Sequence, residues 1–192
     1  MAADESTEVT MWLARHGQTE WSRNGRHTGT TDLPLLPEGE AAAQELADRL
    51  DGVDFNLVLT SPMRRARHTA ELAGFGHADV DPDLVEWNYG AYEGLTTVQI
   101  RERDPAWTVW TEGVPEGETP DDVARRVDRV IAKARAAGGA TLVFGHGHGL
   151  RALTARWLGQ PVVDGRLYKL DTATVSTLGY ERETPVILRW NA

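Results

Sequence analysis

The nine residues VTMWLARHG, from Val9 to Gly17, are mainly apolar as far as Ala14 and then change abruptly to a cation and an imidazole. A short apolar run bounded in this way is typical of a buried strand in a parallel sheet. In open α/β sheets, ligands bind outside the carboxyl ends of the strands. Arg15 and His16 therefore occupy the place at which such a sheet would hold a ligand.

Two further apolar runs end in the same way. Residues 142–144 (LVF) lead to His146, and the pair Leu84-Val85, which we expect to end another strand, leads to Glu86. Because the carboxyl ends of parallel strands meet at one edge of a sheet, ligand-binding side chains gather there. We therefore expect His16, His146 and Glu86 to share one polar site.

A fourth run, residues 57–59 (LVL), precedes Pro62, which suits the first turn of a helix. Arg65 lies near the start of that predicted helix. Free backbone N–H groups at a helix start, with guanidinium groups beside them, make a ready site for an anion. The pattern predicts that Arg65 joins Arg15 at an anion site on the same edge of the sheet.

Apolar residues recur at helical spacing between the predicted strands. A stripe in residues 37–50 predicts one helix, although Leu36 offers it no side-chain cap. Thr119 and Asp122 predict a well-capped helix that ends at Gly138.

A last helix and two closing strands complete the predicted fold, a three-layer α/β/α sandwich with a mostly parallel central sheet flanked by helices. We expect residues 1–192 to form a single domain. The remaining elements are a helix over residues 149–158, strands over 175–180 and 186–190, a loop over 21–36, and a cap or lid over 107–118.

The composition excludes several classes of protein. A net charge of −9 on 192 residues argues against nucleic acid as the main partner, because phosphate backbones bind basic faces. Without cysteine it has no thiolate nucleophile, no disulfide and no Cys-ligated zinc. No run approaches the ~20 apolar residues of a membrane span, and residues 1–9 do not resemble a signal peptide. We expect a cytoplasmic protein without a membrane partner, and leave homo-oligomer formation open.

The chain resembles the histidine phosphatase superfamily, also called phosphoglycerate-mutase-like. Four motifs in one order are far more specific than Arg-His-Gly alone, and they extend from the first predicted strand to Arg151. The resemblance implies a phosphatase that needs no cofactor and acts on a small phosphorylated metabolite. The motifs are Arg15-His16-Gly17, Ser61-x-Met63-x-Arg65-Ala66-x-x-Thr69-Ala70, Leu84-x-Glu86-x-x-Tyr89-Gly90-x-Tyr92-Glu93-Gly94 and His146-Gly147-x-x-Leu150-Arg151.

Phosphate monoester hydrolysis requires a nucleophile and stabilisation of the charge on the transferring group. His16 can attack phosphorus if its ring is neutral and a backbone carbonyl, such as that of Gly17, fixes the other nitrogen. Arg15, Arg65 and a protonated or N–H donating His146 are expected to surround the phosphate.

Glu86 is the expected proton donor to the leaving alkoxide, and the resemblance gives it the same role. It lies beside Trp87 and Tyr89, where removal from water favours a protonated carboxyl group. Pairing with an arginine is the alternative for Glu86, and we expect Glu93 to hold its loop by hydrogen bonds.

Details of the motifs are similar to sugar-bisphosphate phosphatases of the sedoheptulose type and to actinobacterial acid phosphatases. They suggest a small phosphorylated sugar or glycerate as substrate. Ser22 stands where several relatives place Asn, and Trp87, Trp107 and Trp110 either wall the pocket or pack in the core. The expected substrate-binding residues are Gln18, Ser22, His27, Thr28, Gly29, Tyr89, Gly147 and His148.

Three other functions are alternatives to a phosphatase. A cofactor-dependent phosphoglycerate mutase would need an insertion for which residues 94–146 look too short. A metal-dependent hydrolase would use His146 and His148 with His16 and Glu86, but guanidinium groups would oppose the charge of a metal ion, so we expect none. A non-catalytic phospholigand-binding protein would usually have lost the nucleophile. Residues 79–83 (DVDPD) are expected to form an acidic turn.

Overall fold

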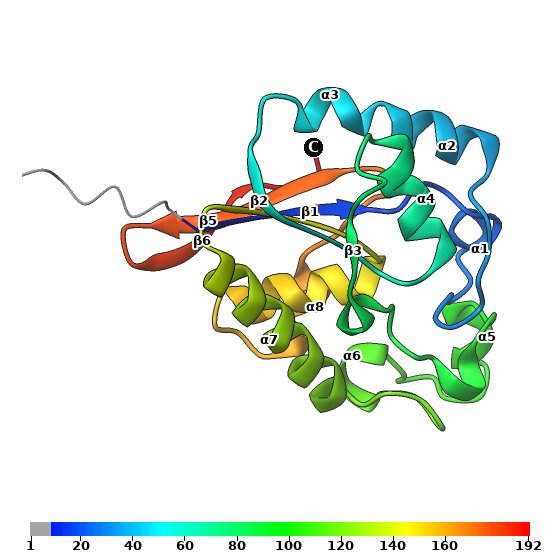
Figure 1. The fold of residues 1–192 in the computed structure, drawn as a ribbon. Coiled ribbons are helices and arrows are strands. Elements are labelled where there is room, and N and C mark those ends of the chain that lie inside the picture. Colours follow the sequence, from blue (N-terminus) through cyan, green and yellow to red (C-terminus); the bar gives the residue numbers. More distant parts are fainter. Residues whose placement is uncertain (1–8) are drawn as a thin grey trace, which may run out of the picture.

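A computed structural model describes residues 9–192 and contains a six-stranded sheet in the order β3-β2-β4-β1-β5-β6 (Figure 1). The strands β1 to β4 run parallel, whereas β5 is antiparallel to both β1 and β6. This confirms the predicted α/β fold with a mostly parallel sheet. The strands are β1 (Thr10–Arg15), β2 (Phe55–Thr60), β3 (Asp79–Val80), β4 (Ala140–Gly145), β5 (Val175–Glu181) and β6 (Thr184–Arg189).

Helices cover both faces of the sheet. Helices α2, α3 and α4 lie on one face and α6, α7 and α8 on the other, while the β5–β6 hairpin projects from one end (Figure 1). The helices are α1 (Glu20–Asn24), α2 (Pro37–Gln44), α3 (Leu46–Leu50), α4 (Arg64–Leu72), α5 (Thr97–Arg101), α6 (Val109–Glu112), α7 (Pro120–Ala137) and α8 (Gly147–Trp157). Short 3₁₀ helices span Pro82–Leu84, Gly90–Tyr92 and Val162–Leu167.

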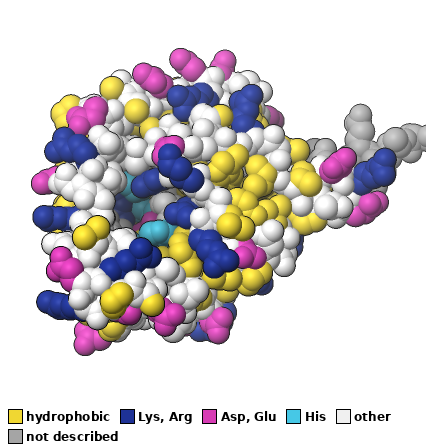
Figure 2. All heavy atoms as spheres, turned by 180° about the vertical axis from the view of Figure 1, so that it is seen from behind, with side chains coloured by type: hydrophobic (Ala, Val, Ile, Leu, Met, Phe, Trp, Pro, Cys, Tyr) yellow, Lys and Arg dark blue, Asp and Glu magenta, His cyan; other side chains and the backbone are white. Residues whose placement is uncertain are grey.

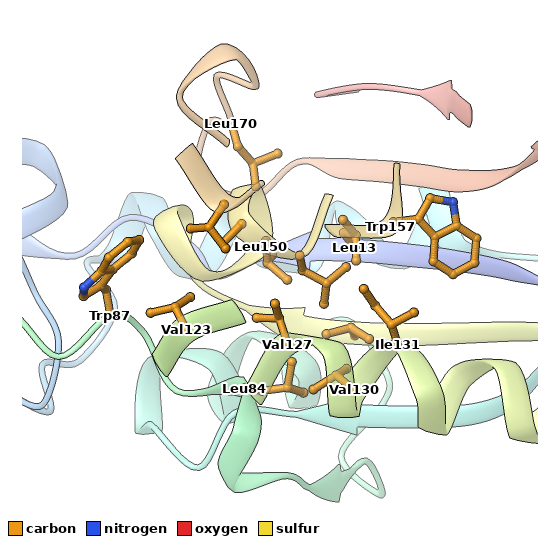
Figure 3. Packing of buried hydrophobic residues seen from close by; sticks show 14 of the residues in the cluster. Leu13, Leu84, Trp87, Val123, Val127, Val130, Ile131, Leu150, Trp157 and Leu170 are labelled. Carbon is orange, nitrogen blue, oxygen red and sulfur yellow. The ribbon is translucent and has the colours of Figure 1, made fainter. Parts of the chain in front are cut away.

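The larger core fills the space between the sheet and helices α7 and α8 (Figure 3). Leu13 of β1 and Leu150 of α8 are buried there with the apolar stripe of α7. The smaller core lies under α3 and α4 and contains Ala14 of β1. Because successive residues of β1 enter opposite cores, its sequence is a continuous apolar run rather than an alternating one. The α7 stripe consists of Val123, Val127, Val130, Ile131 and Ala134.

Helix α7 begins and ends as its sequence predicts. Thr119 and Asp122 form a reciprocal capping box, in which each side chain accepts from the backbone N–H of the other residue. At the other end Gly138 has a φ of 66°, in the left-handed region that glycine adopts without strain.

Three local predictions were wrong. The helix expected over residues 37–50 is divided at Glu45 into α2 and α3, where the Glu45 N–H bonds to the carbonyls of both Ala41 and Ala43. The loop expected over residues 21–36 includes α1, which has a capping box of its own. Leu84-Val85 does not end a strand, because the parallel strand stops at Val80 and the 3₁₀ helix that follows opens with a proline, which has no N–H for a ladder.

The first part of the expected lid packs in the core. Trp107 and Trp110, within residues 107–118, are 2% and 7% exposed and join Trp87 in the larger core. Indole N–H groups of Trp87 and Trp107 donate to backbone carbonyls of Glu118 and Gly113, so these buried side chains have their polar atoms satisfied. The three tryptophans are therefore core residues, and none lines the cavity described below.

Candidate active site

The site forms where β1 and β4 end side by side. Arg15 is in register with Gly145, so the next residues, His16 and His146, emerge as neighbours with ring centroids 5.1 Å apart. The His16 backbone N–H donates to the Gly145 carbonyl at 3.0 Å, which extends the parallel ladder by one residue. Two histidines 130 positions apart in the chain thus share the carboxyl edge of the sheet.

His16 is held in one tautomer. Its Nδ1 lies 2.7 Å from the carbonyl oxygen of Gly17, and because a carbonyl only accepts, Nδ1 carries the proton of the neutral ring. Burial, followed by the charges of Arg65 and Arg15, holds the pKa of His16 well below its usual value. The ring is therefore neutral near pH 7, with the lone pair on Nε2.

Arg15 is fixed between the end of β1 and the start of α8. One terminal nitrogen donates to the Leu170 carbonyl at 2.5 Å, and its buried Nε has no hydrogen-bond partner among the described residues. A Cβ atom at position 147 would lie only 3.2 Å from the Arg15 Cζ. Glycine at position 147 therefore allows the guanidinium to approach the helix start closely.

Arg65 and His146 are buried beside His16 and hydrogen-bond to each other. Arg65 is fully buried, and its Nε donates to His146 Nδ1 at 3.2 Å. His146 Nε2 then donates to the Ser61 hydroxyl at 2.7 Å. Burial, together with the charge of Arg65, holds the pKa of His146 well below its usual value. The terminal nitrogens of Arg65 donate to the carbonyls of Thr28, Gly29 and Thr31.

Of the two forms expected for His146, protonated or N–H donating, this geometry favours the neutral N–H donor. Both ring nitrogens of His146 have partners within the protein, and the nearby arginine charge opposes a second proton. Its orientation is consistent with a neutral ring that holds Arg65 and Ser61 in place.

Glu86 reaches the site through the start of α8. The side chain of the N-cap residue His146 makes no capping hydrogen bond. The Glu86 carboxylate instead accepts hydrogen bonds from backbone N–H groups at the start of α8. Its Oε1 accepts from the backbone N–H groups of Trp87 at 2.8 Å and Gly149 at 2.7 Å, and its Oε2 accepts from that of His148 at 3.0 Å. Orphan donors of the helix thus hold the carboxylate, and Glu86 forms no ion pair with either site arginine.

A cavity of ≈ 180 Å³ opens above His16. In Figure 2, histidine side chains are visible in a hollow rimmed by Lys and Arg side chains. Four predicted site residues, Gln18, Gly29, Arg65 and His146, do not line the cavity. It is lined by Arg15, His16, Ser22, Gly25, Arg26, His27, Thr28, Glu86, Tyr89, Gly147, His148, Arg151 and Leu170.

Ser22 and Gly29, which were predicted to contact the substrate, form hydrogen bonds within the protein. The Ser22 hydroxyl belongs to the capping box of α1, where it accepts from the Thr19 N–H at 2.9 Å. Gly29 is buried, and a Cβ there would lie 2.5 Å from the Trp87 carbonyl oxygen. The Glu93 carboxylate accepts from the Gly29 N–H at 3.0 Å, so Glu93 holds its loop as expected.

Tyr89 and His148 form a short hydrogen bond at the cavity wall, with the phenol oxygen 2.5 Å from Nδ1. Burial raises the pKa of Tyr89 well above its usual value, so the phenol keeps its proton. Burial, followed by the charge of Arg151, lowers the pKa of His148 well below normal. A phenol is a better donor than acceptor, so it donates to Nδ1 and leaves the His148 proton on Nε2.

Sequence reasoning missed two charged residues of the cavity, Arg26 and Arg151. Arg151 stood inside the fourth motif, but no property of the local sequence indicated that it faces the site. Arg26 gave no signal beyond its position next to His27. Within residues 9–192, no three His, Asp or Glu side chains are grouped to hold a metal ion, and no helix is long and apolar enough to cross a membrane.

A neutral, buried histidine beside arginines at the carboxyl ends of parallel strands is the arrangement of an enzyme that transfers phosphoryl groups through histidine. The sequence agrees with this class. The chain belongs to the histidine phosphatase superfamily (branch 1), whose sequence model matches residues 11–192.

Similar proteins include named phosphatases. An acid phosphatase of Mycobacterium tuberculosis is 44% identical over 174 residues, which cover 88% of this chain and 85% of the relative. A sedoheptulose 1,7-bisphosphatase of Saccharomyces cerevisiae is 37% identical over 180 residues, which cover 77% of this chain and 66% of the relative. The solved structure of an open-reading-frame product of Mycobacterium tuberculosis has a TM-score of 0.89 at 39% identity, covering 95% of this chain and 96% of that one.

Proposed function

We propose that the protein hydrolyses phosphate monoesters of small metabolites, such as sugar phosphates, through a phosphohistidine formed on His16. The observation that carries the proposal is the single tautomer of His16, whose Nε2 lone pair is available in a cavity that Arg15 also lines. Membership of the family and the names of the relatives support hydrolysis.

In the first step His16 Nε2 attacks phosphorus, the P–Nε2 bond forms, and the bond from phosphorus to the alcohol oxygen breaks. Arg15 neutralises charge on the phosphoryl oxygens. The leaving alkoxide takes a proton from the carboxylic acid form of Glu86, which becomes the carboxylate. Oε2 of Glu86 accepts one backbone N–H whereas Oε1 accepts two, so Oε2 is the oxygen better able to carry that proton.

In the second step the Glu86 carboxylate accepts a proton from water, and the oxygen of that water attacks the phosphohistidine. The P–Nε2 bond breaks, inorganic phosphate leaves, and both His16 and Glu86 return to their starting states. Because burial and arginine charges lower the pKa of His16, the nucleophile stays neutral in mild acid. This supports an enzyme of the histidine acid phosphatase type.

Trapping the phosphoryl group tests the proposal. Incubation with a ³²P-labelled sugar phosphate and rapid quenching in alkali should give a label that acid releases, because phosphohistidine survives base and not acid. The label should map to His16 and vanish in His16→Ala, whereas the control His68→Ala, a replacement outside the cavity, should keep it. A label on His146 or on a serine would overturn the assignment.

A further inference from the structure

Arg151 brings to the cavity a charge that the proposed phosphoryl transfer does not use. Its Nε donates to the Gly165 carbonyl and its Nη2 to the Arg166 carbonyl, each at 3.0 Å. Its Cζ lies 4.7 Å from the ring centre of Trp110. These contacts fix the guanidinium, and the other terminal nitrogen, Nη1, has no partner within residues 9–192. No carboxylate in that part of the chain pairs with Arg151.

Arg26 supplies a second such charge. Its backbone is held, because its N–H donates to the Trp21 carbonyl at 2.9 Å and it forms a bridge with Thr96. Its exposed side chain lines the cavity and makes no hydrogen bond or ion pair within the described residues. The guanidinium is therefore free to move onto a ligand while its attachment point stays fixed.

The other charges of the cavity do not balance these two arginines. Glu86 is the one carboxylate among the lining residues, and backbone amides already hold it. Burial lowers the pKa of His27 to about 4, and His16 and His148 are also held below their usual pKa. With Arg15 assigned to the reacting phosphoryl group, a local positive charge remains in a chain whose net charge is −9.

We propose that Arg151 and Arg26 bind a second acidic group of the substrate, a phosphate or carboxylate carried on the alcohol that leaves. This rests on the proposed function, because it takes the first phosphoryl group to be held at His16. A guanidinium donates paired N–H groups to either oxyanion. The cavity of ≈ 180 Å³ suits a small metabolite with an acid group at each end.

Pairs of substrates that differ by one acidic group measure the effect of the second acidic group on kcat/KM separately from that of the reacting phosphate. Fructose 1-phosphate and fructose 1,6-bisphosphate differ by one phosphate, and glycerol 3-phosphate and 3-phosphoglycerate differ by one carboxylate. The enzyme should prefer the doubly acidic member of at least one pair in kcat/KM. Arg151→Met should reduce that preference by roughly 10- to 100-fold, as expected for the loss of a charged hydrogen bond. The pair that responds identifies the acidic group.

Arg26→Met provides a second measurement that does not depend on Arg151 and its packing on Trp110, and it should reduce the same preference. The matched control is Arg23→Met, because Arg23 is exposed in α1, pairs with Glu38 and does not line the cavity. It should keep the wild-type preference. Circular dichroism and thermal unfolding establish that each variant is folded.

The outcomes distinguish this inference from the proposed function. If His16 is labelled and phosphate is released, but neither pair shows a preference, the second acidic site is wrong. Equal losses on both members of a pair in both arginine variants would also overturn it, since the arginines would then serve the reacting phosphate. Absence of both labelling and hydrolysis in the folded wild type would instead reject the proposed function.

Discussion

Replacement of His27 should remove one measurable part of the acid sensitivity of this fold. The ring lies against Tyr89, Trp107 and His148, at centroid distances of 4.7, 5.4 and 5.8 Å. Burial lowers its pKa from 6.5 to about 4, and the charge of Glu93 only partly opposes this. As pH falls below 6.5 the unfolded chain therefore binds a proton at residue 27 before the folded protein does. The stability that the neutral His27 contributes is fully present above pH 6.5 and is lost as the pH falls towards 4.

The size of the effect follows from the two pKa values. Each pH unit between them costs about 1.4 kcal/mol of unfolding free energy, so the loss reaches about 3 kcal/mol near pH 4. Between pH 7 and pH 5 it amounts to about 2 kcal/mol. His27→Phe removes the titrating group and keeps an aromatic ring in the same packing. The difference in unfolding free energy between wild type and variant should change by that amount over this range.

Urea unfolding at pH 7, 6 and 5 measures the effect, because a constant offset from altered packing cancels when only the change with pH is compared. The control is His77→Phe, which replaces an exposed histidine. Its difference from wild type should stay nearly constant. If the His27→Phe difference were equally constant from pH 7 to pH 5, the argument from burial would be refuted.

Three further predictions concern catalysis. Glu86→Gln should slow hydrolysis of a sugar phosphate by roughly 10² to 10⁴-fold but p-nitrophenyl phosphate much less, because nitrophenolate leaves without a proton; equal losses would mean that Glu86 only positions the loop. Activity should survive exhaustive chelation and be inhibited by vanadate, whereas restoration of lost activity by zinc would favour a metal site. With 3-phosphoglycerate and catalytic 2,3-bisphosphoglycerate, phosphate release should exceed formation of 2-phosphoglycerate, and the reverse order would indicate a mutase.

The strand-end residues could be predicted because their signal is local. Buried parallel strands are apolar on both faces, so the end of each run marks the sheet edge, as at Arg15 and His146. Glu86 was expected at the same edge for the wrong reason. It follows a 3₁₀ helix and arrives there because its carboxylate accepts the amide N–H groups of residues 148 and 149. A hydrogen bond between residues more than 60 positions apart produces no periodic pattern in the sequence.

The sequence also could not predict which of the site residues are buried and which line the cavity. The sequence predicts that both Arg15 and Arg65 contact the phosphate. In the structure Arg15 lines the cavity, whereas Arg65 is fully buried. The difference arises from carbonyl groups of residues 28–31, which accept the Arg65 N–H groups. Backbone carbonyls are present in every loop and carry no sequence signature. Arg26 and Arg151 were missed for the same reason, since the packing that brings them to the cavity is tertiary.

The choice of nucleophile follows from what each histidine contacts through Nδ1. His16 faces a carbonyl, which can only accept, so its Nε2 bears a lone pair. His146 faces the Nε–H of Arg65, which can only donate, and His148 faces the phenol of Tyr89, so in both rings the proton is on Nε2. Of these three neutral rings at one sheet edge, His16 alone has a nucleophilic Nε2. The other two are donors. The Gly17 carbonyl and the Arg65 N–H have fixed hydrogen-bonding character and assign the roles of His16 and His146, and this is why we place the phosphoryl group on His16.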